Sequence, residues 1–320
     1  MSYSPILIVS GEPNSIFLEL FFKILNKHKI KSPLILISSK RLLELQMKKL
    51  GFKNEIKLLN PSKLELYKLD NKAINLINVK YNPHKAFEKI STKSNIFIKE
   101  SFELAFQIIR KQKIHKFING PISKKNFLNG KYLGITEYIS KKFLSKKTCM
   151  LIYNKKLSVC PVTTHLPLKL IPKKINKKNI SEKVSLIDIF YKKKFNIKPR
   201  IAILGLNPHC ESILKYNEDE KIIGPLIKIL RYKYNVTGPY PADTIFLKNN
   251  RKRFDVIIGM YHDQVLTPIK TLFEYDAINI TLGLPFIRVS PDHGPNESMI
   301  GKNLSNPQSL LSAIKFLDKN

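Results

Sequence analysis

The stretch that decides the fold is Phe254-Asp255-Val256-Ile257-Ile258-Gly259-Met260-Tyr261-His262, an apolar run that stops at a histidine. Residues 159–164 lead into His165 and residues 201–208 lead into His209 in the same way. Short apolar runs bounded by turn residues are typical of buried strands. In an open parallel α/β sheet, ligands bind beyond the carboxyl ends of the strands. The three histidines are therefore candidates to hold one metal ion, because three protein ligands and an open position are typical of a catalytic metal site.

Apolar runs and helical patterns alternate along the chain. The pattern predicts strands at 6–9, 34–37, 116–118, 148–153 and 200–206. It predicts helices at 15–26, 40–50, 98–111, 137–144 and 179–194. Alternation of this kind indicates an α/β architecture with mostly parallel strands. A chain of 320 residues that is 43% hydrophobic can bury a large core, and its length favours two lobes.

The net charge of +32 makes a non-catalytic nucleic-acid-binding protein an alternative to an enzyme. Most of the basic residues are lysines scattered over every segment. No recognition-helix, zinc-finger or aromatic RNA-binding signature accompanies them, so we expect no specific nucleic-acid partner. The charge is better explained as a solvated surface that attracts anionic substrates.

Cysteine usage and hydropathy predict a cytoplasmic protein without a membrane partner. Cys149, Cys160 and Cys210 are odd in number and show no CxxC spacing, which argues against a disulfide framework. The apolar runs fall far short of the roughly 18 residues that a transmembrane helix needs. The first residues carry no basic segment of the kind that opens a secretory signal.

Charged and amide side chains accompany the histidines. Asp263 adjoins His262, and Asp243 lies in the segment 238–244. Carboxylates near metal-bound histidines act as further ligands or accept a hydrogen bond from the distal ring N–H. Basic and amide groups that suit a phosphate or a carboxylate follow the third strand. They are Lys270, Asn279 and Arg288.

Five segments of the chain resemble one known family. They are Val162-Thr163-Thr164-His165-Leu166-Pro167-Leu168, Gly205-Leu206-Asn207-Pro208-His209, Gly238-Pro239-Tyr240-Pro241-Ala242-Asp243-Thr244, Met260-Tyr261-His262-Asp263-Gln264 and Asn279-Ile280-Thr281-Leu282-Gly283-Leu284-Pro285-Phe286-Ile287-Arg288. In this order they are similar to the 4-hydroxythreonine-4-phosphate dehydrogenases of pyridoxal phosphate biosynthesis. The similarity runs from Gly11-Glu12-Pro13 to Asp292-His293-Gly294, which is nearly the whole chain.

The resemblance implies a fold like that of isocitrate and isopropylmalate dehydrogenases, with two α/β lobes, mostly parallel sheets and an interlobe cleft. It implies a homodimer with the active site at the interface, a cofactor that is NAD or NADP, and one divalent metal per site, with zinc, magnesium, cobalt and manganese as candidates. The family's metal ligands correspond to His165, His209 and His262. Its substrate contacts correspond to Thr136, Lys270, Asn279 and Arg288.

The implied reaction is the oxidation of 4-phosphohydroxy-L-threonine at its C3 hydroxyl by hydride transfer to NAD. The product, 2-amino-3-oxo-4-phosphooxybutanoate, then loses carbon dioxide to give 3-amino-2-oxopropyl phosphate. A divalent cation suits both stages, because it lowers the hydroxyl pKa and then accepts enolate charge. We predict catalytic roles for Asp243, Asp263 and Lys270, in tuning the metal, relaying a proton or binding an anion. No GxGxxG follows the first strand, so the cofactor-binding residues stay unassigned.

The chain departs from the family pattern at three places. Ile135 stands where the family has a substrate-contacting histidine before the threonine, and isoleucine cannot hydrogen-bond a phosphate. The loops after Pro13 and His209 lack the usual glycines, which restricts turns with positive φ. The alternatives are a paralogous dehydrogenase for another phosphorylated hydroxy acid, such as a threonate phosphate, and a non-catalytic descendant with the same fold.

The domain boundaries are predicted from the related dehydrogenase fold, in which one lobe collects both chain ends. We expect residues 1–130 and 281–320 to form that lobe. Residues 131–280 then form the central α/β lobe, which carries the metal ligands and the dimer contacts.

Overall fold

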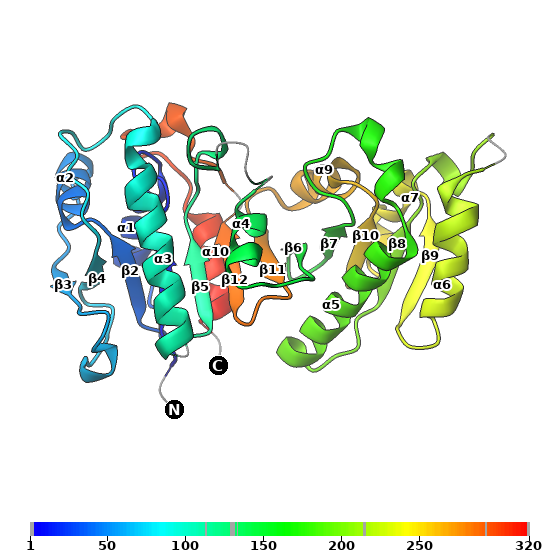
Figure 1. The fold of residues 1–320 in the computed structure, drawn as a ribbon, viewed down its shortest axis with the longest axis horizontal. Coiled ribbons are helices and arrows are strands. Elements are labelled where there is room, and N and C mark those ends of the chain that lie inside the picture. Colours follow the sequence, from blue (N-terminus) through cyan, green and yellow to red (C-terminus); the bar gives the residue numbers. More distant parts are fainter. Residues whose placement is uncertain are drawn as a thin grey trace. The chain divides into compact units, whose positions relative to one another are not determined.

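The computed structural model describes residues 3–112, 114–128, 132, 134–213, 216–291 and 293–318. The chain divides into two compact units, of which unit 1 is Met1–Ile139 with Pro285–Asn320 and unit 2 is Ser140–Leu284. The sequence places the crossings near residues 130 and 280, and the contacts divide the chain after Ile139 and after Leu284. Both units are α/β, as predicted (Figure 1).

Unit 1 is built on a parallel sheet with the strand order β3-β4-β2-β1-β5-β12. The strands are β1 (Ile6–Val9), β2 (Leu34–Ser38), β3 (Ile56–Leu58), β4 (Ile74–Asn78), β5 (Lys116–Asn119) and β12 (Ile287–Pro291). The helices are α1 (Phe17–Lys27), α2 (Lys40–Leu50), α3 (Asn95–Gln112), α4 (Ile135–Lys142), within which the chain leaves the unit, and α10 (Gln308–Leu317). Short helical turns are η1 (Leu64–Leu66), η2 (Thr92–Ser94), η3 (Lys124–Leu128) and η8 (Glu297–Met299).

The central strands β1 and β2 of unit 1 are apolar except for Ser38, as expected where helices cover both faces of a sheet. Every residue of β1 and of β2 is buried, as expected for parallel strands between two helical layers. Helix α3 lies across the face of this sheet that is turned to the viewer (Figure 1), and α1 contacts both α2 and α10. The carboxyl ends of β1 and β5 are brought to one edge by their parallel pairing, in which Val9 lies opposite Asn119.

Unit 2 has the strand order β11-β6-β7-β10-β8-β9. The strands are β6 (Cys149–Tyr153), β7 (Ser158–Pro161), β8 (Ile201–Leu204), β9 (Val236–Tyr240), β10 (Val256–Gly259) and β11 (Ile278–Leu282). The helices are α5 (Lys177–Phe195), α6 (Gly224–Leu230), α7 (Ala242–Ile245), α8 (Lys248–Arg251) and α9 (His262–Phe273). Short helical turns are η4 (Leu168–Leu170), η5 (Pro172–Lys174), η6 (Pro208–Cys210) and η7 (Asp219–Ile223).

Strand direction in unit 2 is mostly parallel, with one exception. Strand β10 pairs in parallel with β7 and with β8, and β8 pairs in parallel with β9. Strand β6 runs antiparallel to both of its neighbours, β7 and β11. It does so because the chain returns from β6 to β7 through a short connection that can only form a hairpin. The mostly parallel sheets predicted from the sequence are confirmed.

Part of the secondary structure was not predicted. Strands β3, β4, β9, β11 and β12 lie outside the predicted strands. Strand β9 contains Gly238 and Pro239, joined by a cis peptide bond, and it lies at the end of the strand order, where a proline in a sheet is tolerated. Among the described residues, no helix has both the length and the apolar character needed to cross a membrane.

Candidate active site

The three predicted metal ligands follow three neighbouring strands of unit 2. His165 follows β7, His209 lies in η6 after β8, and His262 opens α9 directly after β10. Because β7, β10 and β8 are adjacent and parallel, their carboxyl ends meet at one edge of the sheet. The imidazole rings of His165 and His262 lie 5.7 Å apart between centroids. The geometry therefore brings two of the histidines together.

The third histidine is on the same edge of the sheet but not in the same cluster. In the described part of the chain, no three His, Cys, Asp or Glu side chains come together closely enough to hold a metal ion. A joint metal site of His165, His209 and His262 stays a prediction.

Two of these histidines have a left-handed backbone. The φ angle is +51° at His165 and +55° at His209, and it is +62° at the following Cys210. Residues other than glycine adopt this region at a cost on the order of 1–3 kcal/mol, and such conformations cluster at functional sites. Contacts with the surrounding structure must therefore stabilise these backbone conformations. For His209, such contacts are made by the residues just before it.

Asp219 holds the segment that precedes His209. Its carboxylate is buried and accepts hydrogen bonds from the backbone N–H groups of Leu206 and Asn207 at 2.7 and 3.0 Å. It also accepts one from the Asn207 side-chain amide at 2.8 Å. Asp219 was not predicted from the sequence, because nothing in its local pattern shows that an acid 12 residues after Asn207 folds back onto this loop.

The predicted carboxylates take different positions around the histidines. The Asp263 carboxylate lies 2.6 Å from Nδ1 of His262. Asp243 is exposed on α7, after β9. Burial raises the pKa of the Cys210 thiol, and the negative charges of Asp219 and Asp243 raise it further. That influence places Asp243 close to the loop that carries His209.

Two predicted substrate contacts lie in unit 2. Lys270 is in the last turn of α9 and is half-buried. Asn279 is in β11, opposite Ile152 of β6. The side-chain oxygen of Asn279 is buried and has no hydrogen-bond partner among the described residues. An unmade hydrogen bond of this kind costs about 1–3 kcal/mol, so a polar ligand group at this oxygen would restore it.

The other two predicted substrate contacts are bonded to each other in unit 1. Nη1 of Arg288 donates a hydrogen bond to the hydroxyl of Thr136 at 3.2 Å. Arg288 is fully buried, and its Nε donates to the side-chain oxygen of Asn119 at 2.8 Å. Burial lowers the pKa of Arg288 to about 10, and the negative charge of Glu137 opposes that shift. A guanidinium held in this way suits recognition of a phosphate or a carboxylate.

In the loop after Pro13, which lacks the glycines usual in the family, side chains form hydrogen bonds with the backbone. The Asn14 side-chain oxygen accepts a hydrogen bond from the backbone N–H of Glu88 at 2.8 Å, and the Ser15 hydroxyl donates to the backbone oxygen of Glu12 at 2.7 Å. The Glu12 carboxylate accepts from the Ser94 hydroxyl at 3.2 Å. Glu12 is 1% exposed, and burial raises its pKa. No role for Glu12 was predicted, although its place shortly after strand β1 is a signal in the sequence.

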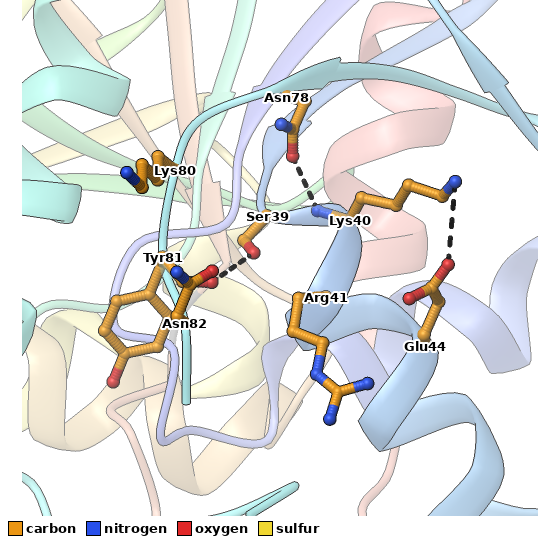
Figure 2. A pocket seen from close by; sticks show the side chains of 8 residues that line it. All are labelled: Ser39, Lys40, Arg41, Glu44, Asn78, Lys80, Tyr81 and Asn82. Carbon is orange, nitrogen blue, oxygen red and sulfur yellow. Dashed lines mark hydrogen bonds and ion pairs between the residues drawn. The ribbon is translucent and has the colours of Figure 1, made fainter. Parts of the chain in front are cut away.

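A separate pocket of about 240 Å³ opens in unit 1 at the carboxyl ends of β2 and β4 (Figure 2). It is lined by Ser39, Lys40, Arg41, Glu44, Asn78, Lys80, Tyr81 and Asn82. The Ser39 hydroxyl donates to the backbone oxygen of Tyr81 at 2.7 Å, and the Lys40 N–H donates to the Asn78 side chain at 2.8 Å. These bonds join the start of α2 to the segment after β4. The described lining includes none of the predicted site residues.

The class of the protein follows from its architecture. Two α/β units on mainly parallel sheets, with both chain ends in one unit, form the isocitrate/isopropylmalate dehydrogenase-like fold. A solved 4-hydroxythreonine-4-phosphate dehydrogenase from Klebsiella pneumoniae superposes with a TM-score of 0.82 at 26% identity, covering 98% of each chain. Residues 29–317 match the model of the family described as pyridoxal phosphate biosynthetic protein PdxA, and the chain belongs to this family.

Two relatives are named for two different activities. A 4-hydroxythreonine-4-phosphate dehydrogenase from Sulfurihydrogenibium sp. (strain YO3AOP1) is 38% identical over 318 residues, covering 97% of this chain and 96% of the relative. A D-threonate 4-phosphate dehydrogenase from Pectobacterium atrosepticum is 33% identical over 235 residues, covering 70% of this chain and 72% of the relative. The prediction of an oxidoreductase is confirmed.

Proposed function

We propose that this chain oxidises 4-phosphohydroxy-L-threonine at its C3 hydroxyl with NAD as the hydride acceptor, in pyridoxal phosphate biosynthesis. The β-keto acid so formed then loses carbon dioxide to give 3-amino-2-oxopropyl phosphate. The observation that carries the proposal is the placement of His165, His209 and His262 beyond three adjacent parallel strands. The 38% identity to a named enzyme of this activity, over nearly the whole chain, supports it.

The imidazole donors suit a divalent metal by their chemistry, although no three such side chains of the described residues lie close enough together here to hold one. His165, His209 and His262 would hold it, and three imidazoles favour zinc, cobalt or manganese over magnesium, which prefers oxygen ligands. Because Nδ1 of His262 bonds to Asp263, the other ring nitrogen of His262 is left for coordination. The bound metal would supply Lewis acidity, which lowers the pKa of a hydroxyl and accepts charge on oxygen.

The chain's own side chains would position the substrate and move its protons. Arg288 with Thr136 would hold one anionic group, and Lys270 would hold a second or take the C3 hydroxyl proton. Asn279 would bind a polar substrate group with its buried side-chain oxygen. Asp263 would keep the His262 ring oriented, and Asp243 would relay a proton near the His209 loop. We further propose that the protein is a homodimer in the cytoplasm. NADP is the alternative cofactor.

A second candidate function is the oxidation of D-threonate 4-phosphate. Ile135 favours it as a departure from the family pattern, because the first side chain of α4 has no polar atom where the family has a substrate-contacting histidine. The 33% identity to a D-threonate 4-phosphate dehydrogenase supports it as well. Both candidates share a phosphate and an oxidisable hydroxyl, so the same site serves either.

The test is NADH formation by the purified protein with each of the two substrates. The proposal expects turnover with 4-phosphohydroxy-L-threonine, its loss on treatment with a chelator, and its recovery when zinc, cobalt or manganese is added back. Turnover with D-threonate 4-phosphate alone would replace the proposed substrate by the second candidate. A folded, metal-loaded protein that oxidises neither compound would refute both.

A further inference from the structure

We propose that Asn119 is a positioning residue for substrate recognition, which orients the buried guanidinium of Arg288 without neutralising its charge. The inference rests on the proposed function, in which Arg288 binds an anionic group of the substrate. Asn119 would orient the guanidinium that does so. The ligand class is an organic phosphate or carboxylate, which Arg288 would contact directly and Asn119 would not.

Asn119 and Arg288 lie on two neighbouring strands of unit 1. Strands β5 and β12 pair in parallel, with Arg288 opposite Phe117 and Val289 opposite Ile118. Asn119 ends β5, so its side chain comes next to the Arg288 guanidinium, and its side-chain oxygen accepts from Nε at 2.8 Å. Both side chains are buried, with exposures of 2% for Asn119 and 0% for Arg288.

The Asn119 amide is itself held in one orientation. Its Nδ2 donates to the backbone oxygen of Gly120 at 2.9 Å, which leaves the side-chain oxygen turned toward Arg288. Nη1 of Arg288 is held at the same time by the hydroxyl of Thr136 at the start of α4. Contacts at two different nitrogens fix the plane of the guanidinium, because that group is rigid and planar.

The acceptor for Nε of Arg288 is a neutral amide and not a carboxylate. An aspartate at position 119 would accept the same bond but would form a buried ion pair with Arg288. An anionic substrate would then have to compete with an internal carboxylate for the guanidinium. The neutral amide gives orientation alone, and the charge of Arg288 stays available to the substrate. If Asn119 had only a structural role, an amide and a carboxylate would serve equally well, since either accepts a hydrogen bond from Nε of Arg288.

The deciding experiment compares Asn119→Asp, which adds a carboxylate, with Asn119→Ala, which removes the acceptor. Steady-state kinetics with 4-phosphohydroxy-L-threonine and calorimetric titration with inorganic phosphate are measured for each. For Asn119→Asp we expect the substrate KM and the phosphate Kd to rise at least about tenfold, with kcat and the KM for NAD changed by less than about twofold. For Asn119→Ala we expect a smaller rise in both constants.

Asn75→Asp is the matched control. Asn75 lies in β4 of the same unit, is equally buried and donates to two backbone oxygens, of Leu34 and Asp70, so the same chemical change destabilises unit 1 without touching Arg288. It should lower the melting temperature and leave the substrate KM and the phosphate Kd unchanged. The inference is wrong if folded Asn119→Asp and Asn119→Ala both bind substrate and phosphate as the unchanged protein does.

Failure of the proposed function is distinguishable from failure of this inference. If the unchanged protein oxidises neither phosphorylated substrate, the proposed function fails. The phosphate titration still decides the role of Asn119, because it needs no turnover. If Asn119→Asp does not fold, the phosphate Kd and substrate KM of Asn119→Ala decide the question, and unchanged values would overturn the inference.

Discussion

At the residue scale, the candidate site contains pairs in which one side chain orients another through a hydrogen bond. Asp263 accepts from His262, and Asn119 accepts from Arg288. The first pair was predicted, because its members are adjacent in the sequence. The second was not, because 169 residues separate its members and only the pairing of their strands brings them together.

Asp263→Asn should weaken metal binding. The amide is a poorer acceptor than the carboxylate for the ring N–H of His262, and loss of such a partner typically costs about 10–100-fold in metal affinity. The measurement is zinc affinity by competition with a chromophoric chelator. Glu274→Gln, at the other end of α9, is the control and should leave the affinity unchanged. Equal affinity of Asp263→Asn and the unchanged protein would contradict the proposed role of Asp263 in orienting the His262 ring.

Glu12 should make the protein less stable as the pH rises. Burial raises its pKa above the ordinary value of 4.5, so the folded state binds more protons than the unfolded state. The stability that this group contributes is present below pH 4.5 and is lost as the pH rises through the raised pKa. Glu12→Gln, which has no proton to lose, should flatten the profile of melting temperature against pH over this range. Glu44→Gln, at an exposed position of α2, is the control. Parallel profiles for Glu12→Gln and the unchanged protein would refute the prediction.

At the element scale, local signals predicted helices α1 to α5 but not α6 to α10, and they predicted some strands but not others. The helix predicted at 40–50 is α2 (Lys40–Leu50), which begins after the capping Ser39 and ends at Gly51 with φ +77°. Both ends are set by nearest neighbours in the chain. The direction of β6 is not local, because it depends on the strand that returns beside it. Short strands such as β3 and β12 also escaped prediction.

Two glycines of unit 1, Gly11 after strand β1 and Gly51 at the end of helix α2, should differ widely in their tolerance of substitution. A Cβ at Gly11, which has φ +73°, would lie 2.3 Å from the backbone oxygen of Pro121. Gly51 has nearly the same φ, +77°, but no heavy atom within 4 Å of its Cβ position. Gly51→Ala should cost about 1–2 kcal/mol of unfolding free energy for the backbone conformation alone, and Gly11→Ala should cost clearly more. Urea denaturation measures both, and equal costs would show that the end of β1 can move away from Pro121.

At the scale of the whole molecule, the net charge of +32 should act on the substrate rather than on the fold. A positive field attracts phosphorylated anions, and salt screens it over about 10 Å at 0.1 M. We expect kcat/KM for the phosphorylated substrate to fall by roughly tenfold between low and high salt, mainly through KM. Steady-state kinetics in a salt series, with the melting temperature as the control for stability, tests this. A salt-independent KM would show that the lysines do not contribute to substrate capture.

The sequence by itself determined the α/β class, the two lobes, the family and the identity of the candidate residues. It could do so because strand ends, helix caps and family motifs are properties of short segments. The tertiary structure decided which of these residues meet: His165 with His262, Thr136 and Asn119 with Arg288, and Asp219 with the loop before His209. These contacts depend on strand order and register, which no local segment specifies, and on burial, which sets how strongly each charge acts.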